Sequence, residues 1–473
     1  MKTARRITSN FLSLATAELA SKIVQLVIFV YIARTFGKSG FGDFGFALAF
    51  STIVIVLADF GINNLLIREI SRDKKNADKY VSNALVIKLI LAVVTFIISY
   101  IFLYFFDKSG SLTIITFLMV LFIVIQSFTD LFYSVFRAFE RMYYDALIKI
   151  VRMVVLLALV FVSIANGKGL VIVTSMFPLT ELIILVISLI IYIKNFAKLS
   201  LRFDFGFEKL IIKKSSFFAL SIMFGTLLLY IDTIMLEKIK GSAEVGIYAA
   251  AYNLLLGVTF IPLMFSNAIF PVFSRYFIKD KSLLKFAYKK ASHYMLTLGL
   301  PITLGIFVYA RNIILLVYGA EYAKSIIAVK ILCWFILLRF INITSGTLLS
   351  SIDRQGARVV GQGIVASINI VLNLMLIPKY GFVGAAIAAI ASESFFLFAY
   401  NYFIFKEGLN FKLLGASIKP VIASIMMVVA IAFIPNLFIG FVVGAVSYFG
   451  ALFMLRAFKS EDKNLLIRVI ENR

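Results

Sequence analysis

Ionisable side chains inside long apolar stretches are the residues of this sequence that could do chemistry. Glu18, Lys22 and Gln25 follow one another at i, i+4 and i+7, so they share one face of a helix. A charge at the centre of a bilayer costs roughly 3 kcal/mol unless it has a protein partner or water. Two interpretations of Lys22 stay open: an internal ion pair with Glu18, or a cation that contacts a phosphate while Glu18 tunes it.

A second apolar stretch carries Lys330 and Arg339 and has no acidic residue between positions 323 and 350. The planar guanidinium of arginine matches a carboxylate or a phosphate through two parallel hydrogen bonds. We expect Arg339 to pair either with Glu393 on another helix or with an anionic ligand. The candidate substrate-binding residues are therefore Lys22, Gln25, Lys330 and Arg339.

Buried carboxylates are the second group of candidates, for ion coupling or gating. Asp232 is the best of them, because Lys22, Arg34 and Lys238 are plausible neighbours. Acids near helix ends tie helices together or form gates, whereas mid-helix acids carry a proton or stabilise a nearby cation. Two amides on one face, Asn369 and Asn373, are expected to form hydrogen bonds between helices, with sugar binding as the other possibility. The full set of candidate carboxylates is Asp59, Asp232, Glu18, Glu181 and Glu393, and Arg34 is the candidate cation of an outer loop.

The elements that carry these residues must be membrane-spanning helices. Of 473 residues, 62% are hydrophobic and 15% are charged, and the mean hydropathy is +1.01. Soluble domains are near 45–50% apolar, so this composition excludes a soluble enzyme, a nucleic-acid-binding protein and a disordered chain. Apolar runs of about 20 residues, each long enough to cross a bilayer, recur along the chain. They predict an all-α polytopic protein with about fourteen spans, at 11–33, 42–66, 81–106, 112–136, 147–166, 169–193, 214–237, 245–270, 293–318, 323–350, 358–378, 381–405, 413–435 and 437–458.

The basic residues between these runs predict the topology. With the N-terminus in the cytoplasm, 34 Lys and Arg lie in inside segments and 9 in outside segments, a bias that favours both termini in the cytoplasm. The longest connections, 194–213 and 271–292, are both basic. No outside loop is long enough to fold alone, so the working surface is expected to be a cavity between helices. Single copies of cysteine and histidine, Cys333 and His293, exclude metal sites built from several such ligands, and we expect no cofactor.

An internal repeat links two connecting segments. A basic residue, Arg34 or Lys238, is followed by glycine at +3 and +8 and by an aromatic residue at +10, with an offset of 204 residues. This spacing predicts two halves, near 1–205 and 206–410, followed by 411–473 with two additional helices and a short cytoplasmic tail. Because both halves start from the cytoplasm, the repeat is parallel, and its axis runs along the membrane normal with a path between the halves.

Several segments, in order along the chain, resemble one family of membrane transporters. They are Ala33-Arg-Thr-Phe-Gly37 with Phe41-Gly42, Ala58-Asp-Phe-Gly61 with Arg68-Glu69, Phe136-Arg-Ala138 with Glu140-Arg141, Asp232-Thr-Ile-Met235 with Val245-Gly-Ile-Tyr248, and Leu372 to Gly381 with Gly384-Ala-Ala386. The sequence is similar to the polysaccharide biosynthesis (O-antigen) flippases of the multidrug/oligosaccharidyl-lipid/polysaccharide exporter superfamily. The resemblance implies two bundles of six helices, arranged as in MATE transporters, and two further C-terminal helices.

The function that the resemblance implies is transport rather than catalysis. A polyprenyl-diphosphate-linked oligosaccharide would pass from the cytoplasmic to the outer leaflet of the cell membrane by alternating access, for the assembly of a surface polysaccharide or glycan. Partners would be this lipid, membrane lipid and, for coupling, H⁺ or Na⁺, but not nucleic acid. Two alternatives stay open: an ion-coupled multidrug or cation exporter of the same fold, and a membrane polysaccharide polymerase or ligase.

Overall fold

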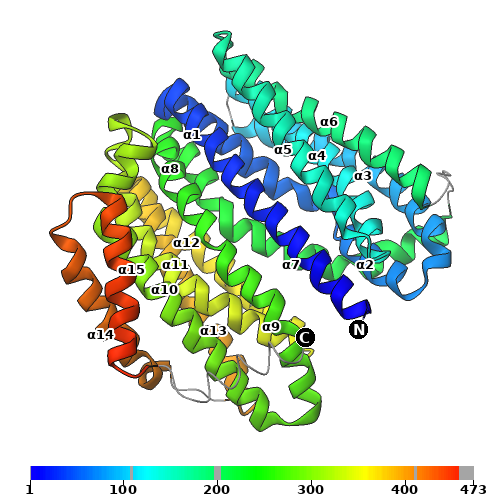
Figure 1. Cartoon of the computed structure of the whole chain (residues 1–473). Helices are drawn as coiled ribbons and strands as arrows, with labels where there is room; N and C mark the ends of the chain where they lie inside the picture. The colour runs from blue at the N-terminus through cyan, green and yellow to red at the C-terminus, as the bar shows by residue number, and fades with distance from the viewer. Residues whose placement is uncertain (1, 107–109, 197–203, 410–412, 458–473) are drawn as a thin grey trace. The chain divides into compact units, whose positions relative to one another are not determined.

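The computed structural model is all-helical over the part of the chain that it describes, residues 2–106, 110–196, 204–409 and 413–457 (Figure 1). The earlier helices are α1 Lys2–Asp59, α2 Ile62–Arg72, α3 Ala77–Phe106, α4 Ser111–Ala138, α5 Met142–Ala165, α6 Leu170–Asn195, α7 Phe205–Lys240 and α8 Ser242–Val258. The later helices are α9 Phe260–Lys279, α10 Lys281–Val317, α11 Ser325–Ser351, α12 Gln355–Tyr380, α13 Phe382–Lys406, α14 Leu413–Ala432 and α15 Leu437–Met454. Two single 3₁₀ turns, Lys74–Asn76 and Ala320–Tyr322, complete the set.

Twelve helical stretches of the described chain are long and apolar enough to cross a membrane. One of them, 16–59, contains two predicted spans, and a shorter apolar helix at Ile418–Ala432 corresponds to the thirteenth predicted span. The expected polytopic, all-helical fold is confirmed, and the structure accounts for each of the fourteen predicted spans.

The long helix α1 turns back on itself at Gly37, whose φ of 65° interrupts the helical backbone. The ring centroids of Phe29 and Phe44 are 5.5 Å apart. In a straight helix 15 residues would separate them by about 22 Å along the axis, so the two arms of α1 pack against each other. Glycine is suited to this position because it adopts positive φ without a steric penalty.

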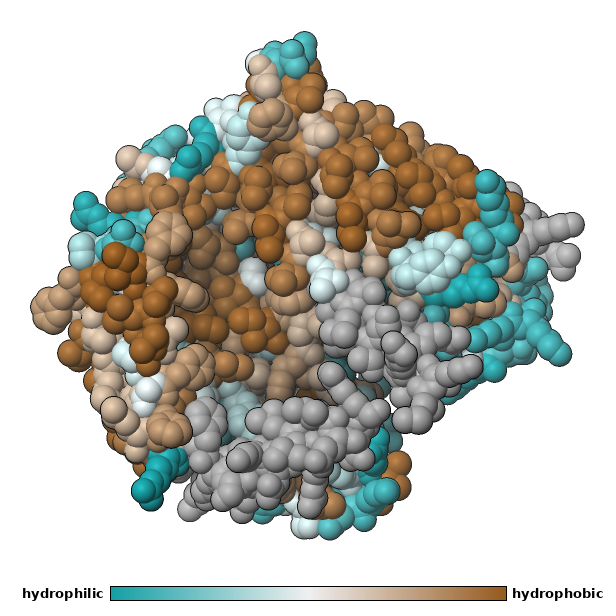
Figure 2. All heavy atoms as spheres, in the orientation of Figure 1, coloured by the Kyte–Doolittle hydropathy of each residue, from teal (hydrophilic) through white to brown (hydrophobic). Residues whose placement is uncertain are grey.

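Exposed apolar side chains distinguish this surface from that of a soluble protein. On α3, for example, Val93, Ile97 and Ile101 are each about half exposed, at 59%, 53% and 48%. Figure 2 shows that apolar residues cover a broad area of one face of the molecule, which a soluble protein would not leave in water. We therefore treat the chain as a multi-pass membrane protein.

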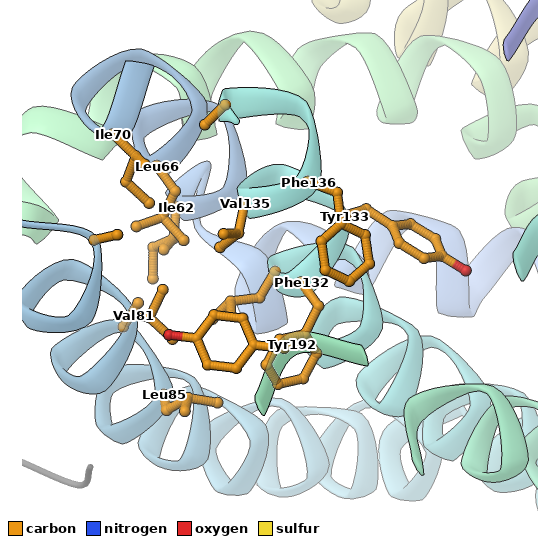
Figure 3. Close-up of a cluster of buried hydrophobic side chains, with 14 of the residues drawn as sticks. Ile62, Leu66, Ile70, Val81, Leu85, Phe132, Tyr133, Val135, Phe136 and Tyr192 are labelled. Atoms are coloured by element: carbon orange, nitrogen blue, oxygen red, sulfur yellow. The ribbon is translucent and has the colours of Figure 1, made fainter. Parts of the chain in front are cut away.

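Two predicted boundaries differ from the structure. The predicted span 42–66 is broken at Phe60 and Gly61, which both have positive φ, so that α2 is a separate amphipathic helix. Its apolar face, including Ile62, Leu66 and Ile70, packs against α3, α4 and Tyr192 of α6 (Figure 3). The predicted connection 271–292 is also helical except at Asp280, where one Asp side chain caps α10. The first difference was missed because the apolar run continues through Phe60 and Gly61, and the second because residues 271–292 are too polar to be recognised as a span.

The described chain divides into two compact units. Unit 1 comprises Met1–Ala250 and Gln362–Ala385, and unit 2 comprises Ala251–Gly361 and Ala386–Arg473. In unit 1, α1 packs on α3, α4, α5 and α7. In unit 2, α10 packs on α9, α11, α14 and α15. The division of the sequence at 205 and 410 stays a prediction.

The two repeated turns meet within unit 1. Gly37 and Gly241 have nearly the same backbone angles, φ 65° and ψ −174° against φ 86° and ψ 174°. A Cβ atom built on Gly42 would lie 1.8 Å from the carbonyl oxygen of Ser242, and one built on Gly246 would lie 1.8 Å from that of Lys38. The offset of 204 residues pairs Gly42 with Gly246 and Lys38 with Ser242, so each of these contacts is the repeat equivalent of the other. A local two-fold axis relates two such contacts.

The same axis passes between the next pair of residues. A Cβ on Gly45 would lie 3.3 Å from the Cβ of its repeat partner Ala249. Small residues let two helix backbones approach closely in membranes. We call Gly42, Gly45, Gly246 and Ala249 the glycine seam.

Candidate functional site

A network of charged side chains lies inside unit 1 where α1, α4, α5 and α6 meet. On α5, Asp145, Lys149 and Arg152 stand at i, i+4 and i+7 and share one face. That face meets the Glu18 and Lys22 face of α1, because the Lys149 ammonium donates to the Glu18 carboxylate. Two helices with the same spacing of polar residues are thereby held together within an otherwise apolar bundle.

Asp145 is the most heavily paired carboxylate of the network. It is fully buried and accepts from Arg137 Nε at 2.6 Å, and Lys149 Nζ lies 3.3 Å from its other oxygen. Removing one partner from such a buried group costs about 3–5 kcal/mol. Asp145, Arg137 and Lys149 therefore form the structural part of the network.

Lys22 and Arg152 have fewer hydrogen-bonding and ion-pair partners than Asp145. Lys22 is exposed and donates only to Gln25 Oε1, at 3.3 Å. Among the side chains that the structure describes, no carboxylate oxygen lies within 4.0 Å of its ammonium, so the internal pair with Glu18 is not formed. Arg152 Nε lies 3.4 Å from Glu181, but neither this nitrogen nor the Glu181 oxygens make a hydrogen bond.

The charges of these two cations act on each other. The charge of Arg152 acts directly on Lys22, and the Arg152 side chain stays 16% exposed over the Phe122 ring. A guanidinium with unused donors beside an exposed ammonium can bind an anion with several oxygens. The sequence analysis counted Lys149 and Arg152 among the cytoplasmic basic residues, although both fall within the predicted span 147–166, and so did not consider them as site residues. In the structure both lie on α5, which begins at Met142.

Asp59 has a partner that the sequence analysis did not identify. Lys88 of α3 is completely buried and donates to Asp59 Oδ1 at 2.7 Å and to the Ser127 carbonyl at 2.8 Å. The pair ties α1, α3 and α4 together. The sequence feature that could have indicated this pair is Lys88 itself, a single lysine within the long apolar run 81–106.

Arg339 is paired in unit 2 as expected. Its Nη1 donates to Glu393 Oε1 at 2.6 Å, and Asn342 Nδ2 donates to the second carboxylate oxygen, also at 2.6 Å. The Arg339 side chain is 22% exposed and Glu393 only 5%. Arg339 Nε has no hydrogen-bond partner in the described chain, so one edge of the guanidinium is unused.

Asp232 lies among neutral donors in unit 1. The carboxylate is 1% exposed and accepts from Asn373 Nδ2 at 2.7 Å and from the Tyr248 hydroxyl at 3.1 Å. The expected cation Lys238 instead donates to the Phe106 carbonyl. The amide of Asn373 also bonds to Asn369, so both predicted amides join α12 to α7 through this carboxylate.

The two remaining predicted cations lie elsewhere. Arg34 is exposed on α1, three residues before the turn at Gly37. Lys330 is exposed on α11, with its ammonium 5.5 Å from the Phe307 ring centroid. In the part of the chain that the structure describes, no three His, Cys, Asp or Glu side chains come together as metal ligands would.

Comparison with known proteins shows which families the sequence of this chain matches. Residues 7–277 match the family described as polysaccharide biosynthesis protein, and residues 218–375 match the MatE family. The probable low-salt glycan biosynthesis flippase Agl15 of Haloferax volcanii is 24% identical over 78% of this chain and 77% of its own length. The capsular polysaccharide biosynthesis protein CapF of Staphylococcus aureus is 23% identical over 84% of this chain and 99% of its own.

Solved structures share the fold. The lipid II flippase MurJ in an inward closed conformation superposes with a TM-score of 0.78, at 16% identity, over 94% of this chain and 98% of that chain. An inward-facing multidrug resistance MATE family transporter gives 0.70, at 15% identity, over 82% and 95%. The first family match covers more than half of the sequence. The chain therefore belongs to the polysaccharide biosynthesis protein family, and it has the fold of the MurJ and MATE transporters.

Proposed function

We propose that this protein flips a polyprenyl-diphosphate-linked oligosaccharide from the cytoplasmic to the outer leaflet of the cell membrane. Family membership and the names of the two relatives support transport of a glycan precursor. The single observation that carries the proposal is that Lys22 and Arg152, two cations within the membrane-spanning helices whose charges act on each other, make no hydrogen bond to a carboxylate of the described chain.

A diphosphate fits these groups better than a neutral or cationic ligand. It offers several oxygens and at least two negative charges to the Lys22 ammonium and the free donors of Arg152. The acids of the network, Glu18 and Glu181 among them, keep the empty site close to neutral, which lowers the cost of holding cations in a bilayer. Arg339 supplies a further cation in unit 2, with Glu393 holding the guanidinium in place.

The test is flipping of a fluorescent lipid-linked oligosaccharide in proteoliposomes by Lys22→Gln. One hydrogen bond to a charged group is worth about 1.5–3 kcal/mol, so we expect a loss of about 10- to 150-fold. Because no carboxylate of the described residues lies within 4.0 Å of Lys22, the substitution leaves none of them buried and unpaired, and membrane levels should stay normal. Lys168→Gln, an exposed cation between α5 and α6, is the matched control. Parental flipping by Lys22→Gln would exclude Lys22 from the site.

Asp232 is the group that we propose couples transport to H⁺ or Na⁺. A carboxylate that is buried and held only by neutral donors can accept a proton or bind a cation, and Asn373 Oδ1 is a nearby buried oxygen without a hydrogen-bond partner. Asp232→Asn keeps the shape and both hydrogen-bonding neighbours. We expect it to abolish the dependence of flipping on pH or sodium, and an unchanged response to both ions would remove Asp232 from the mechanism.

The glycine seam is the place where we propose that the outer side closes. In the predicted topology both turns face outside, and the reciprocal contacts of Gly42 and Gly246 bring the two repeats together there. Alternating access requires this contact to form and break in each cycle.

A cation exporter of the same fold is the second candidate, and the matches to the MatE family and to a MATE structure favour it. Such a site would need a net negative charge, whereas Lys22 and Arg152 are the under-used groups of the network. Thermal stabilisation of the purified protein separates the two candidates. Lipid-linked diphosphate sugars should raise Tm if the chain is a flippase, and cationic dyes should raise it if the chain is an exporter.

A further inference from the structure

A cleft in unit 2 lies away from the charge network. It has a volume of about 400 Å³ and opens between the end of α10 and the start of α15. Its walls are Arg311, Asn312, Leu315, Leu316, Asn436, Leu437 and Phe438. The volume falls within the range of small-molecule sites.

The charged group of this cleft is Arg311. It is exposed, and among the described residues no carboxylate oxygen lies within 4.0 Å of it. The other polar side chains are already committed: Asn312 donates to the Pro435 carbonyl at 2.9 Å, and Asn436 caps α15 by accepting from the Phe438 and Ile439 amides. The guanidinium is therefore the available donor.

A second cation, Lys330 of α11, lies outside the walls of the cleft and contacts α10 at Phe307. Phe307 precedes Arg311 by one helical turn, and the Lys330 ammonium of α11 lies 5.5 Å from its ring centroid. Lys330 likewise has no carboxylate oxygen within 4.0 Å in the described chain. The only tryptophan of the sequence, Trp334, lies edge-on to Phe307 and is 40% exposed. Tryptophan beside basic residues is typical of the membrane–water interface.

The apolar walls decide what kind of anion occupies the cleft. Leu316 and Phe438 are 54% and 73% exposed on helices long and apolar enough to cross a membrane, so we expect them to contact acyl chains. A soluble phosphate would leave these side chains without a partner, whereas a phospholipid supplies a phosphate and acyl chains together. Basic clefts between membrane helices bind such head groups.

We propose that this cleft is a binding site for the phosphate of an anionic phospholipid, with Arg311 as the cation in its wall and Lys330, beside Phe307, as a second cation that the same lipid reaches outside the cleft. The inference is independent of flipping and assigns Lys330 to bulk lipid instead of to the transported lipid. In the predicted topology the site lies in the outer leaflet.

The experiment is lipid binding to the purified full-length chain in detergent, by native mass spectrometry and thermal shift. Phosphatidylglycerol should bind at least fivefold more tightly than phosphatidylcholine, and inorganic phosphate should not stabilise the protein. Each basic residue near an anionic lipid contributes about fivefold, so Arg311→Gln should weaken binding about fivefold, and the double variant with Lys330→Gln about 25-fold.

The matched control is Lys168→Gln with Lys379→Gln, two exposed cations outside the cleft, which should bind phosphatidylglycerol within twofold of the parent. Equal binding of the two phospholipids, or parental binding by the double variant, would overturn the proposal. So would displacement of phosphatidylglycerol by an equimolar polyprenyl diphosphate, because the cleft would then belong to the transported lipid. Flipping activity is measured separately, so a failure here leaves the proposed function untouched.

Discussion

Replacing Gly246 by alanine tests the glycine seam most directly. The added methyl group would lie 1.8 Å from the Lys38 carbonyl oxygen, far inside van der Waals contact. Because the obstructing atom belongs to the backbone, it cannot rotate away as a side chain could, and the two helices must separate by roughly 1.5 Å. Overpacking of this kind costs about 1–3 kcal/mol. The closed arrangement alone bears that cost, which shifts the closed-to-open ratio by about 5- to 150-fold.

Two assays follow this shift. Flipping in proteoliposomes should slow, because the outer side closes less often. A cysteine at Ala249, in a Cys333→Ala background, should react faster with a membrane-impermeant maleimide. Gly257→Ala is the matched control, since it lies on the same helix α8 and its Cβ would meet nothing within 4 Å. Parental flipping together with parental labelling in Gly246→Ala would refute the idea that the seam moves.

A reversible disulfide across the glycine seam tests the same proposal in a second variant, in case Gly246→Ala does not fold. Cβ atoms at positions 45 and 249 would be 3.3 Å apart, close to the 3.5–4.5 Å of a disulfide. Oxidation of Gly45→Cys/Ala249→Cys should stop flipping and reduction should restore it, while either single cysteine stays active. Transport at the parental rate with the disulfide intact would contradict the proposal.

Three further experiments, with five substitutions, test the ion pairs. Lys88→Met leaves Asp59 buried without a cation and should destabilise the protein by about 3–5 kcal/mol in thermal unfolding, with Asp59→Asn in the same chain restoring much of the loss. Arg339→Gln should slow flipping and lower Tm, and adding Glu393→Gln should restore Tm but not flipping if the guanidinium contacts substrate. Burial raises the pKa of Glu69, but the hydrogen bond from its arginine neighbour and three nearby cations lower it below its usual value. This stabilisation is present above about pH 4.3 and is lost as pH falls through the lowered pKa, so the Tm difference between parent and Glu69→Gln should vanish in acid; a constant difference would contradict it.

Apolar run length was enough to predict the helices, because a bilayer admits little else. It failed where a helix is amphipathic and not continuously apolar. Helix α2 is amphipathic, and only the positive φ at Phe60 and Gly61 separates it from α1. The sequence feature that marks this break is the Phe60-Gly61 pair, but the same pair is also compatible with the middle of an apolar run.

The repeat was predictable from glycine spacing because the backbone itself imposes it. Gly37 and Gly241 need positive φ, and Gly42 and Gly246 need room for a carbonyl oxygen. Neither requirement depends on the rest of the fold. The matching conformation of the two turns is therefore visible in the structure, whereas the two halves inferred from the repeat stay a prediction.

Ion-pair partners were harder to predict from the sequence, because they depend on the rotation of each helix about its axis. Glu18 and Lys22 share a face, yet Glu18 bonds to Lys149 on another helix. Asp232 was expected among cations and lies among amides. Spacing within one helix predicts which residues point the same way, but not what they meet.

Under the proposed function, the charge network offers a reason for the many acids around the cationic site. Cations alone would make the empty site costly in a bilayer and would hold a diphosphate too tightly to release it. Asp145 takes two cations as fixed partners, whereas Glu181 touches Arg152 without a hydrogen bond. The first arrangement fixes the helices in place, and the second leaves a guanidinium that can exchange a weak carboxylate contact for a phosphate. Transport requires this weaker kind of pairing, because the ligand must be bound on one side and released on the other.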